Sequence, residues 1–373
     1  MIRSALALTA LTVSTGVAQA GGIDRSGTPI DIIFEEGNYA TLSYGYADPS
    51  LTGVDREGAN VRNIAAGFGL VGVALKLDIA ENVSLAFILD EPYGVDVEYG
   101  PESAVLGGTL ADAESYGITT LVRYQATDRI SVYGGPRFVR AKGQINLGGS
   151  AYFLDGYESN FASDTGTGYV IGAAYEIPDI AFRAALTYHS EIDLSFDTTE
   201  TFPASAASIP FPLPTGVPVP TGTTNTTLPQ SIKLAVQSGI ATDTLVFGSV
   251  RWVDHDVFMV IPPVFPENLA SLDSSITYEL GIGRRFSERF SARASVIYED
   301  VLADDLVSPL TPTSGFTALS IGGQYQLTEA LDISGGIRYT WLGDATAEVS
   351  DSVVGEFRNN DVVSFGLKLG VRF

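Results

Sequence analysis

Hydrophobic and polar residues alternate along most of this chain with a period of two. After Asp361, apolar side chains take every second position to the end: Val363, Phe365, Leu367, Leu369, Val371 and Phe373. The residues between them are mostly small or polar. Because successive side chains of a strand point to opposite faces, this pattern predicts a strand with one apolar face that ends at the last residue.

The same alternation predicts fourteen strands, an even number. Short polar connections, such as residues 80–82, 126–129 and 328–330, alternate with longer connections rich in Gly, Pro, Ser and Asp. Tight turns on one rim and long loops on the other are typical of an outer-membrane β-barrel. The strands are centred near Leu42, Val73, Phe87, Leu121, Phe138, Gly172, Ala185, Leu234, Val250, Leu280, Ala294, Gly322, Ile337 and Leu367.

The pattern therefore predicts an all-β fold, a transmembrane antiparallel barrel of about fourteen strands. A large soluble β-sandwich or solenoid also alternates, but its apolar face points into the molecule. Aromatic residues near the predicted strand ends favour the barrel, because interfacial girdles are expected there. Examples are Tyr44, Tyr116, Tyr188, Tyr339 and Trp341.

The first twenty residues have the pattern of an export signal. Arg3 is followed by an apolar run, and Ala18 and Ala20 flank Gln19 as an A-x-A cleavage site. The alternative is a buried N-terminal helix. We therefore divide the chain into a signal peptide (1–20), a short plug segment (21–37) and a barrel (38–373). No later run reaches the 18 or so apolar residues that a membrane helix needs.

Composition excludes several classes of function. The chain has 373 residues, 44 Asp plus Glu against 21 Lys plus Arg, and a net charge of −23, which argues against a nucleic-acid partner. With no Cys and two His, it lacks the residues of most metal and catalytic sites. No G-x-S-x-G motif occurs. We expect no enzyme activity and no cofactor.

Several stretches together resemble the FadL/TodX family of outer-membrane transporters for long-chain fatty acids and other hydrophobic compounds. They are FILDEPYG (87–94), FVRAK (138–142), ALTYHSE (185–191), LPQ (228–230) and VRWVD (250–254). Their order and spacing carry the resemblance more than any one of them. It implies a fourteen-stranded barrel that binds a long-chain fatty acid or another hydrophobic small molecule.

The front of the chain departs from this resemblance. Such proteins begin with a plug that carries an Asn-Pro-Ala motif, whereas residues 21–37 are short and lack it. The segment contains an apolar cluster of Ile30, Ile32, Ile33 and Phe34, which would be costly to expose to water. Either it fills the lumen as a reduced plug, or it is a disordered leader.

Basic residues on the face opposite the lipid are expected to line the lumen. Such cations either hold an anionic head group or pair with lumenal carboxylates such as Asp78, Asp332 and Glu299. The resemblance implies that Arg140 and Lys142 are the best pair for a ligand carboxylate. The residues on this face are Lys76, Arg123, Arg183, Lys233, Arg293, Arg338, Lys368 and Arg372.

Two external loops carry apolar residues. In the segment 202–229, prolines hold the backbone extended and separate large apolar side chains. This segment is either a capture surface for a lipid tail or a Pro-rich linker packed over the barrel mouth. The predicted capture residues are Phe153, Leu154, Phe161, Phe202, Ile209, Phe211 and Leu213.

Pro92 interrupts what is otherwise a long strand from Ser84 to Tyr99. Proline removes a donor from the ladder, so pairing should break around Pro92, Tyr93 and Gly94. By the resemblance, this region is a strand kink that opens the wall sideways and lets a ligand leave into the bilayer. The alternative is an ordinary bulge.

The sequence as a whole predicts passive transport of fatty acids or similar molecules across an outer membrane. The alternatives are a diffusion porin for polar solutes and a structural or adhesive barrel. Outer-membrane lipid and lipopolysaccharide are the expected neighbours of the barrel. Acidic loop residues such as Asp300, Asp304 and Asp305 either share divalent cations with lipopolysaccharide or are simply solvated.

Overall fold

A computed structural model of the protein describes residues 22–208, 215–265, 267–270, 272–303 and 306–373. The predicted signal peptide (1–20) therefore lies outside the described residues. No helix in these ranges has the length and apolar character needed to cross a membrane. The helical segments that the structure describes are η1 (Ile30–Phe34), η2 (Pro178–Ile180), η3 (Ala204–Ser208) and η4 (His255–Val257).

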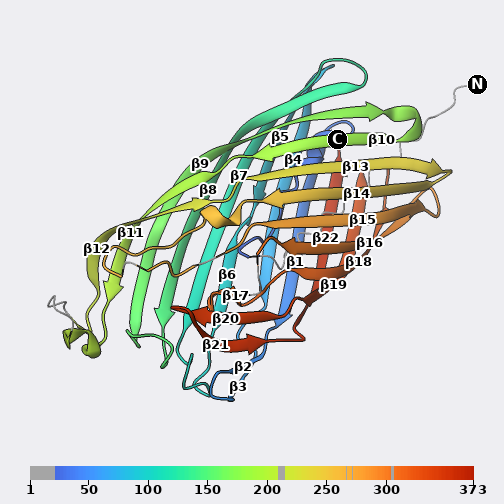
Figure 1. The fold of residues 1–373 in the computed structure, drawn as a ribbon. Helices are drawn as coiled ribbons and strands as arrows, with labels where there is room; N and C mark the ends of the chain where they lie inside the picture. The colour runs from blue at the N-terminus through green and yellow to red at the C-terminus, as the bar shows by residue number, and fades with distance from the viewer. Residues whose placement is uncertain (1–21, 209–214, 266, 271, 304–305) are drawn as a thin grey trace, which may run out of the picture.

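A closed antiparallel sheet of seventeen strands forms the body of the molecule (Figure 1). β1 (Tyr39–Ser50) pairs with β22 (Asp361–Arg372) on one side and with β4 (Phe68–Ala80) on the other, which closes the barrel. Closure leaves no unpaired edge in lipid. The wall also contains β5 (Val83–Asp90), β6 (Gly94–Glu98), β7 (Leu110–Gln125), β8 (Ile130–Leu147), β9 (Tyr157–Ile177), β10 (Phe182–His189), β11 (Ile192–Thr201), β12 (Val219–Leu228), β13 (Ser231–Ala241), β14 (Thr244–Val253), β15 (Ser275–Arg285), β16 (Phe290–Val301), β18 (Phe316–Gln326) and β19 (Leu331–Leu342).

At three positions along the wall, two strands lie end to end, so the seventeen strands occupy fourteen positions around the barrel. We call each of these positions a stave. β5 and β6 both pair with β7, and β10 and β11 both pair with β9. β13 and β12 in turn pair with β10 and β11. The prediction of fourteen strands is confirmed, and each predicted centre falls in a different stave. β6 lies within the interrupted strand predicted from Ser84 to Tyr99, whereas β11 and β12 were not predicted.

The barrel has its apolar side chains outside and many polar ones inside. Leu280 and Ile337 are 66% and 62% exposed on the outer wall, whereas the side chains of Asp332 and Ser364 are fully buried in the lumen. A soluble fold would place these residues the other way round. The apolar outer wall is the surface that meets lipid.

The apolar face changes sides at each of the three breaks. Because strand side chains alternate with a period of two, a one-residue shift at a break moves the apolar set to the other face. Beyond the breaks, on the side of the long loops, the apolar residues face the lumen. The change runs from Phe87 and Leu89 to Val95 and Val97, from Leu186 to Ile192 and Leu194, and from Ile232 and Leu234 to Leu228.

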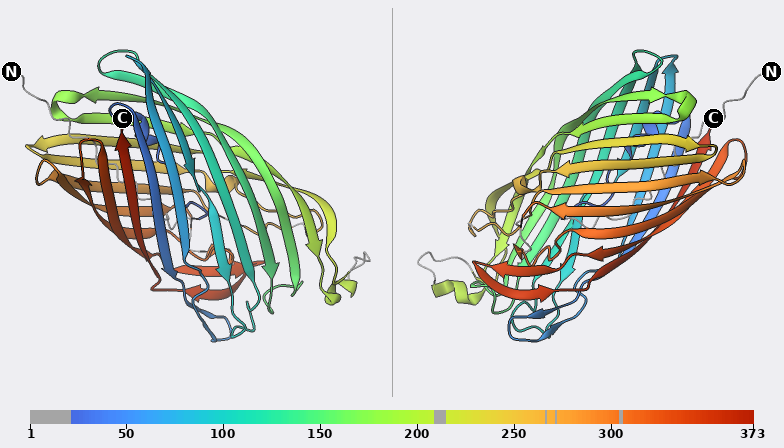
Figure 2. Two further views of the ribbon diagram at one scale, coloured as in Figure 1. Left: turned by 180° about the vertical axis from the view of Figure 1, so that it is seen from behind. Right: turned by 45° about the vertical axis from the view of Figure 1, so that its right-hand side comes forward.

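The tight turns and the C-terminus lie at one end of the barrel, and the long connections lie at the other (Figure 2). At that second end a separate five-stranded sheet crosses beside the mouth. It buries Phe357, whose ring lies 6.2 Å from that of Tyr99. This sheet was not predicted. Its strands are β2 (Gly53–Asp55), β3 (Asn60–Val61), β17 (Leu306–Val307), β20 (Ala345–Val349) and β21 (Ser352–Phe357).

The N-terminal segment 22–37 packs against the inner wall of the barrel. η1 contacts β4 and β5, and its Ile33 is fully buried in an apolar cluster with Ile88 and Leu121. Three of the four apolar residues of this segment noted in the sequence, Ile30, Ile32 and Ile33, are buried. We call residues 22–37 the plug.

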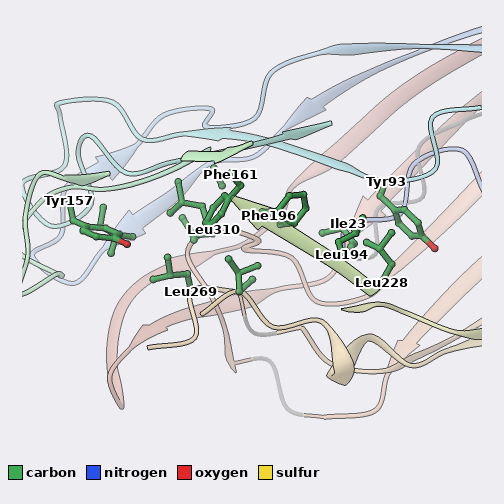
Figure 3. Close-up of a cluster of buried hydrophobic side chains, with 14 of the residues drawn as sticks. Ile23, Tyr93, Tyr157, Phe161, Leu194, Phe196, Leu228, Leu269 and Leu310 are labelled. Atoms are coloured by element: carbon green, nitrogen blue, oxygen red, sulfur yellow. The ribbon is translucent and has the colours of Figure 1, made fainter. Parts of the chain in front are cut away.

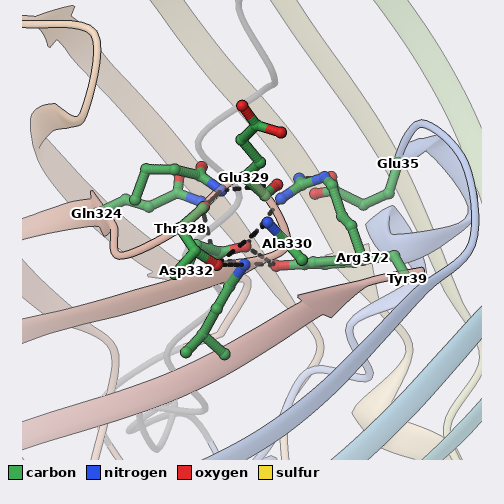
Figure 4. A network of polar contacts seen from close by, with 10 residues as sticks. Glu35, Tyr39, Gln324, Thr328, Glu329, Ala330, Asp332 and Arg372 are labelled. Carbon is green, nitrogen blue, oxygen red and sulfur yellow. Dashed lines mark hydrogen bonds and ion pairs between the residues drawn. The ribbon is translucent and has the colours of Figure 1, made fainter.

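The last residues of the plug are tied to the end of the barrel by buried charges (Figure 4). Arg372 donates to Asp332 at 2.8 Å and to Glu35 of the plug at 2.9 Å. Asp332 also accepts hydrogen bonds from Tyr39 and Gln324. These hydrogen bonds offset the cost of removing the Asp332 carboxylate from water. The network therefore fixes the end of the plug to β1, β19 and β22.

Candidate functional site

An apolar cavity of about 100 Å³ lies in the lumen, on the side of the long loops. Apolar side chains surround it (Figure 3). Dry apolar cavities of this kind take up apolar ligands, since they offer water no hydrogen-bond partners. Its lining includes Phe161, Leu194, Phe196, Leu228, Val260 and Leu310.

The cavity owes its lining to the broken staves. The change of face at the breaks turns Leu194, Phe196 and Leu228 inward. Phe161 of β9, whose ring lies 6.0 Å from that of Phe196, and Ala111 of β7 continue the wall. Apolar residues of the loops that follow β14 and β17 cover the cavity from the external end.

Ile23 and Tyr93 close the opposite end of the cavity. Ile23 belongs to the plug, and its side chain lies next to Leu194 and Phe196 (Figure 3). Tyr93 belongs to the break between β5 and β6. Backbone bonds join the two segments, from the amide of Arg25 to the Pro92 carbonyl at 2.8 Å and from the amide of Gly94 to the Ile23 carbonyl at 2.9 Å. The plug is therefore attached to the wall at the break.

The strand ladder changes partner at this break. β5 pairs with both β4 and β7, but among the described strands β6 pairs with β7 alone. The other edge of β6 is bonded to residues 64–66, with the amide of Glu98 donating to the Ile64 carbonyl at 2.8 Å. Arg25 of the plug lies beside Gly94, with its guanidinium 4.1 Å from the ring centre of Phe68. A Cβ atom on residue 94 would lie only 2.5 Å from the Arg25 guanidinium. A side chain at position 94 would have to displace the flexible end of Arg25.

A layer of buried charges lies directly below the cavity floor. Asp24, the neighbour of Ile23, accepts a hydrogen bond of 2.5 Å from Arg251 of β14. His255 Nε2 lies 3.9 Å from the same carboxylate oxygen. Burial by itself would raise the pKa of Asp24, but Arg251 and His255 lower it below its usual value. Asp24 is therefore an anion in the lumen.

A second guanidinium in this layer ties the plug to β5 and β10. Arg137 donates to Thr28 of the plug at 3.2 Å and to His189 at 3.4 Å. Asp90 accepts hydrogen bonds from the hydroxyls of Ser26 and Thr28, at 2.6 and 2.8 Å. The polar residues of the plug are therefore held by the wall on both sides.

Farther from the cavity, Phe34 anchors the plug. Its ring lies between the guanidinium groups of Arg123 and Arg183, at 4.8 and 4.4 Å, and meets Tyr133 edge to face. Cation–π contacts stabilise such an arrangement. The plug is thus held at three levels: the break, the charged layer and Phe34.

The basic residues predicted to line the lumen lie on the inward faces of their strands. Carboxylates pair with several of them. Lys76 pairs with Asp78, Arg123 with Glu176, and Arg372 with Asp332. These three cations therefore pair with carboxylates of the barrel itself, which is the second of the two alternatives given by the sequence.

Arg140 and Lys142, predicted to hold a ligand carboxylate, lie on the outer face of β8. Arg140 is exposed and donates to the Ser163 hydroxyl at 2.7 Å, and Lys142 pairs with Glu114 at 2.8 Å. Lys142 borders the cavity, but its side chain is 58% exposed. By strand parity, Arg140 shares the outward face of Phe138, whereas the buried neighbours Arg137 and Val139 face the lumen. The carboxylate role of this pair stays a prediction that the geometry does not favour.

The structure exposes some of the predicted capture residues and buries others. Phe153 is 84% exposed, whereas Leu154, Phe161 and Phe202 are buried, and Phe161 lines the cavity. Ile209, Phe211 and Leu213 lie outside the described residues, as do Asp304 and Asp305. The segment 202–229 is not wholly an extended loop, because Val219–Leu228 forms β12.

Sequence reasoning missed Asp24, Arg137 and Arg251, which form the charged layer. Two signals were available. Arg137 lies on an odd position of β8, opposite in parity to the outward residues Ile130, Val132 and Phe138, so the alternation could have placed it in the lumen. Arg251 lies in the VRWVD stretch that carries the family resemblance, but no charge partner for it is evident without the fold.

Comparisons with known proteins agree with this architecture. A family model described as outer membrane protein transport protein (OMPP1/FadL/TodX) matches residues 43–364. Outer membrane protein P1 of Haemophilus influenzae is 20% identical over 319 residues, which cover 75% of this chain and 68% of that protein.

Solved structures show the same fold. A FadL homologue of Pseudomonas aeruginosa superposes with a TM-score of 0.76 at 14% identity, covering 96% of this chain and 98% of that one. The toluene transporter TodX of Pseudomonas putida superposes with a TM-score of 0.67 at 13% identity, covering 91% of each chain. The barrel fold is therefore shared with these two proteins.

Proposed function

Because this chain belongs to the family of outer-membrane transport proteins described as OMPP1/FadL/TodX, we propose that it passes hydrophobic or amphipathic small molecules through its apolar lumenal cavity. The family consists of transport channels of the outer membrane. The observation that carries the proposal is the apolar cavity in the lumen, lined by Phe161, Leu194, Phe196 and Leu228. Transport would be passive, with burial of apolar surface as the driving force.

The size of the cavity bears on the ligand. An apolar cavity of about 150 Å³ is enough to bind benzene, so about 100 Å³ accommodates a small apolar group or one end of a chain. The TodX relative is described as a toluene transporter. We propose long-chain fatty acids or similar hydrophobic molecules as ligands, with only part of a long ligand in the cavity at a time.

Capture would begin at the external end. The side chain of Phe153 is almost fully exposed on a loop, and Val217 is half exposed near the start of β12. Exposed apolar residues at a barrel mouth are a first contact for a ligand that water excludes. In this account Phe161 and Phe202, which are buried, belong to the interior that receives the ligand.

Exit would follow the break between β5 and β6. Ile23 and Tyr93 close the cavity there, and Arg25 lies at the break. If the segment 23–25 moved away from the break, the cavity would open to the lipid outside Phe68. The alternative is that the break is a bulge that relieves strain, with passage toward the periplasm through the lumen.

Uptake into proteoliposomes tests the proposal against the two other functions. We expect the purified protein to give saturable uptake of toluene and of oleate. We expect arabinose to enter no faster than into empty liposomes, because the plug and the cavity lining obstruct a water-filled path. Fast arabinose swelling would identify a porin. A barrel that admits neither the sugar nor the hydrophobic probes would be structural or adhesive.

A further inference from the structure

One guanidinium in the lumen has no partner within the barrel. Arg338 lies on the inner face of β19, between Ile337 and Tyr339, whose side chains are exposed on the outer wall. Among the described residues it forms no ion pair and no hydrogen bond, and its Nε atom is buried. An unpaired charge inside a membrane protein is costly, and residues of this kind generally belong to a functional site.

Two hydroxyl groups close to Arg338 lack partners as well. Ser364 pairs with Arg338 across the ladder between β19 and β22, and Ser334 lies four residues before Arg338 on the same face of β19. Both serines are buried, and neither Oγ atom has a hydrogen-bond partner among the described residues. A guanidinium only donates hydrogen bonds, so the group missing from this part of the lumen is an acceptor.

The charges near Arg338 do not supply that acceptor. Glu279 of β15 is the carboxylate that faces Arg338, but the two side chains form no ion pair. Arg293 of β16 adds a second guanidinium nearby. Its own carboxylate neighbours are Glu279 and Asp31 of the plug. Glu279 is thus shared by two guanidinium groups, and Arg338 keeps free donors.

The wall around Arg338 fits a small polar ion and not an apolar tail. The residues beside it in register are Ser320 and Ser364, and the next inward row consists of glycines. The apolar cavity is lined by other residues. The planar fork of a guanidinium matches a tetrahedral oxyanion, which it binds through two parallel hydrogen bonds.

We propose that Arg338 is the centre of a lumenal binding site for a small tetrahedral oxyanion of the sulfate or phosphate type, with Ser364 as a further donor. The anion accepts two hydrogen bonds from the guanidinium and one from the hydroxyl, and it neutralises the charge that the barrel leaves unpaired. The inference goes beyond the proposed function, because the site and its ligand are separate from the apolar cavity.

Titration calorimetry of sulfate into the full-length mature protein in detergent tests this. Sulfate should bind the wild type at one site, and Arg338→Gln should weaken that binding at least about tenfold, because charge-assisted hydrogen bonds are lost. The matched control Arg289→Gln removes the same charge from an exposed turn and should bind sulfate as tightly as the wild type. The proposal is overturned if the wild type binds no sulfate, or if the two variants bind it equally well.

A measurement on the wild type protects the test against a variant that fails to fold. Crystals soaked with selenate should give an anomalous selenium peak beside the Arg338 guanidinium. The milder variant Ser364→Ala should give a weaker peak at the same place, since one donor is lost. Selenium found only on the outer surface of the wild type, or nowhere, contradicts the proposal.

Discussion

Replacement of Ala111 by phenylalanine is expected to abolish saturable uptake of hydrophobic probes. Ala111 is buried on the inward face of β7 and lines the cavity with Leu194 and Phe196. A phenyl ring there occupies the space that a ligand would need, while the lining remains apolar. Overpacking of this kind costs about 1–3 kcal/mol when the surroundings must move, so a ligand would compete poorly with the ring.

The matched control is Ala173→Phe. Ala173 lies on the outward face of β9 between Ile171 and Tyr175, so the same change there adds a ring that meets lipid. Proteoliposome uptake of toluene should fall at least about tenfold in Ala111→Phe, the effect of losing roughly 1.4 kcal/mol of binding, and stay at the wild-type level in Ala173→Phe. Equal uptake by the two variants would mean that ligands do not pass through the cavity.

A disulfide between positions 24 and 93 is expected to stop uptake reversibly. Asp24 and Tyr93 form an antiparallel bridge, and the flanking bonds of Arg25 and Gly94 make it a non-hydrogen-bonded pair. The Cα atoms of such a pair are about 4.5 Å apart, within reach of a disulfide. In Asp24→Cys/Tyr93→Cys the bond would fix the plug to the break and keep the cavity closed.

Because the chain has no native Cys, the engineered pair has no competitor. Oxidised protein should take up toluene at least about tenfold more slowly than the same protein after reduction, as for a locked lid. The single variant Asp24→Cys should respond to neither oxidant nor reductant. If the oxidised and reduced double variants transport equally, ligands do not leave past the segment 23–25, and the lateral route is wrong.

Strand periodicity alone located the membrane-spanning part of this protein. The outward residues Leu367, Leu369 and Val371 repeat every second position because lipid covers one face of the wall along its whole height. That constraint comes from the bilayer and needs no knowledge of neighbouring strands. Each predicted strand centre therefore falls in its own stave.

Beyond the breaks the same rule is less informative. In β11 the residues Ile192, Leu194 and Phe196 alternate as regularly as any spanning strand, but their apolar face points into the lumen. Apolar residues keep the even positions from Leu186 to Phe196, so the periodicity of the sequence does not mark the change of face.

The site was only partly predictable. Pro92 identified the break, because proline cannot continue a ladder, and β5 does end at Asp90 and β6 does begin at Gly94. The charged layer was not predictable, since Asp24 and Arg251 are 227 residues apart in the chain and meet only in the closed barrel. Arg140 was proposed as a carboxylate ligand from the family resemblance alone, and the parity of β8, which points it outward with Phe138, was not used there.

The most direct test of a ligand path through the cavity is a crystal structure with a bromine-labelled ligand. Crystals of the mature protein soaked with 4-bromotoluene should give an anomalous bromine peak enclosed by Ile23, Phe196 and Leu228. A peak confined to the lipid-facing wall or to the polar part of the lumen, with the apolar cavity empty, would contradict the account.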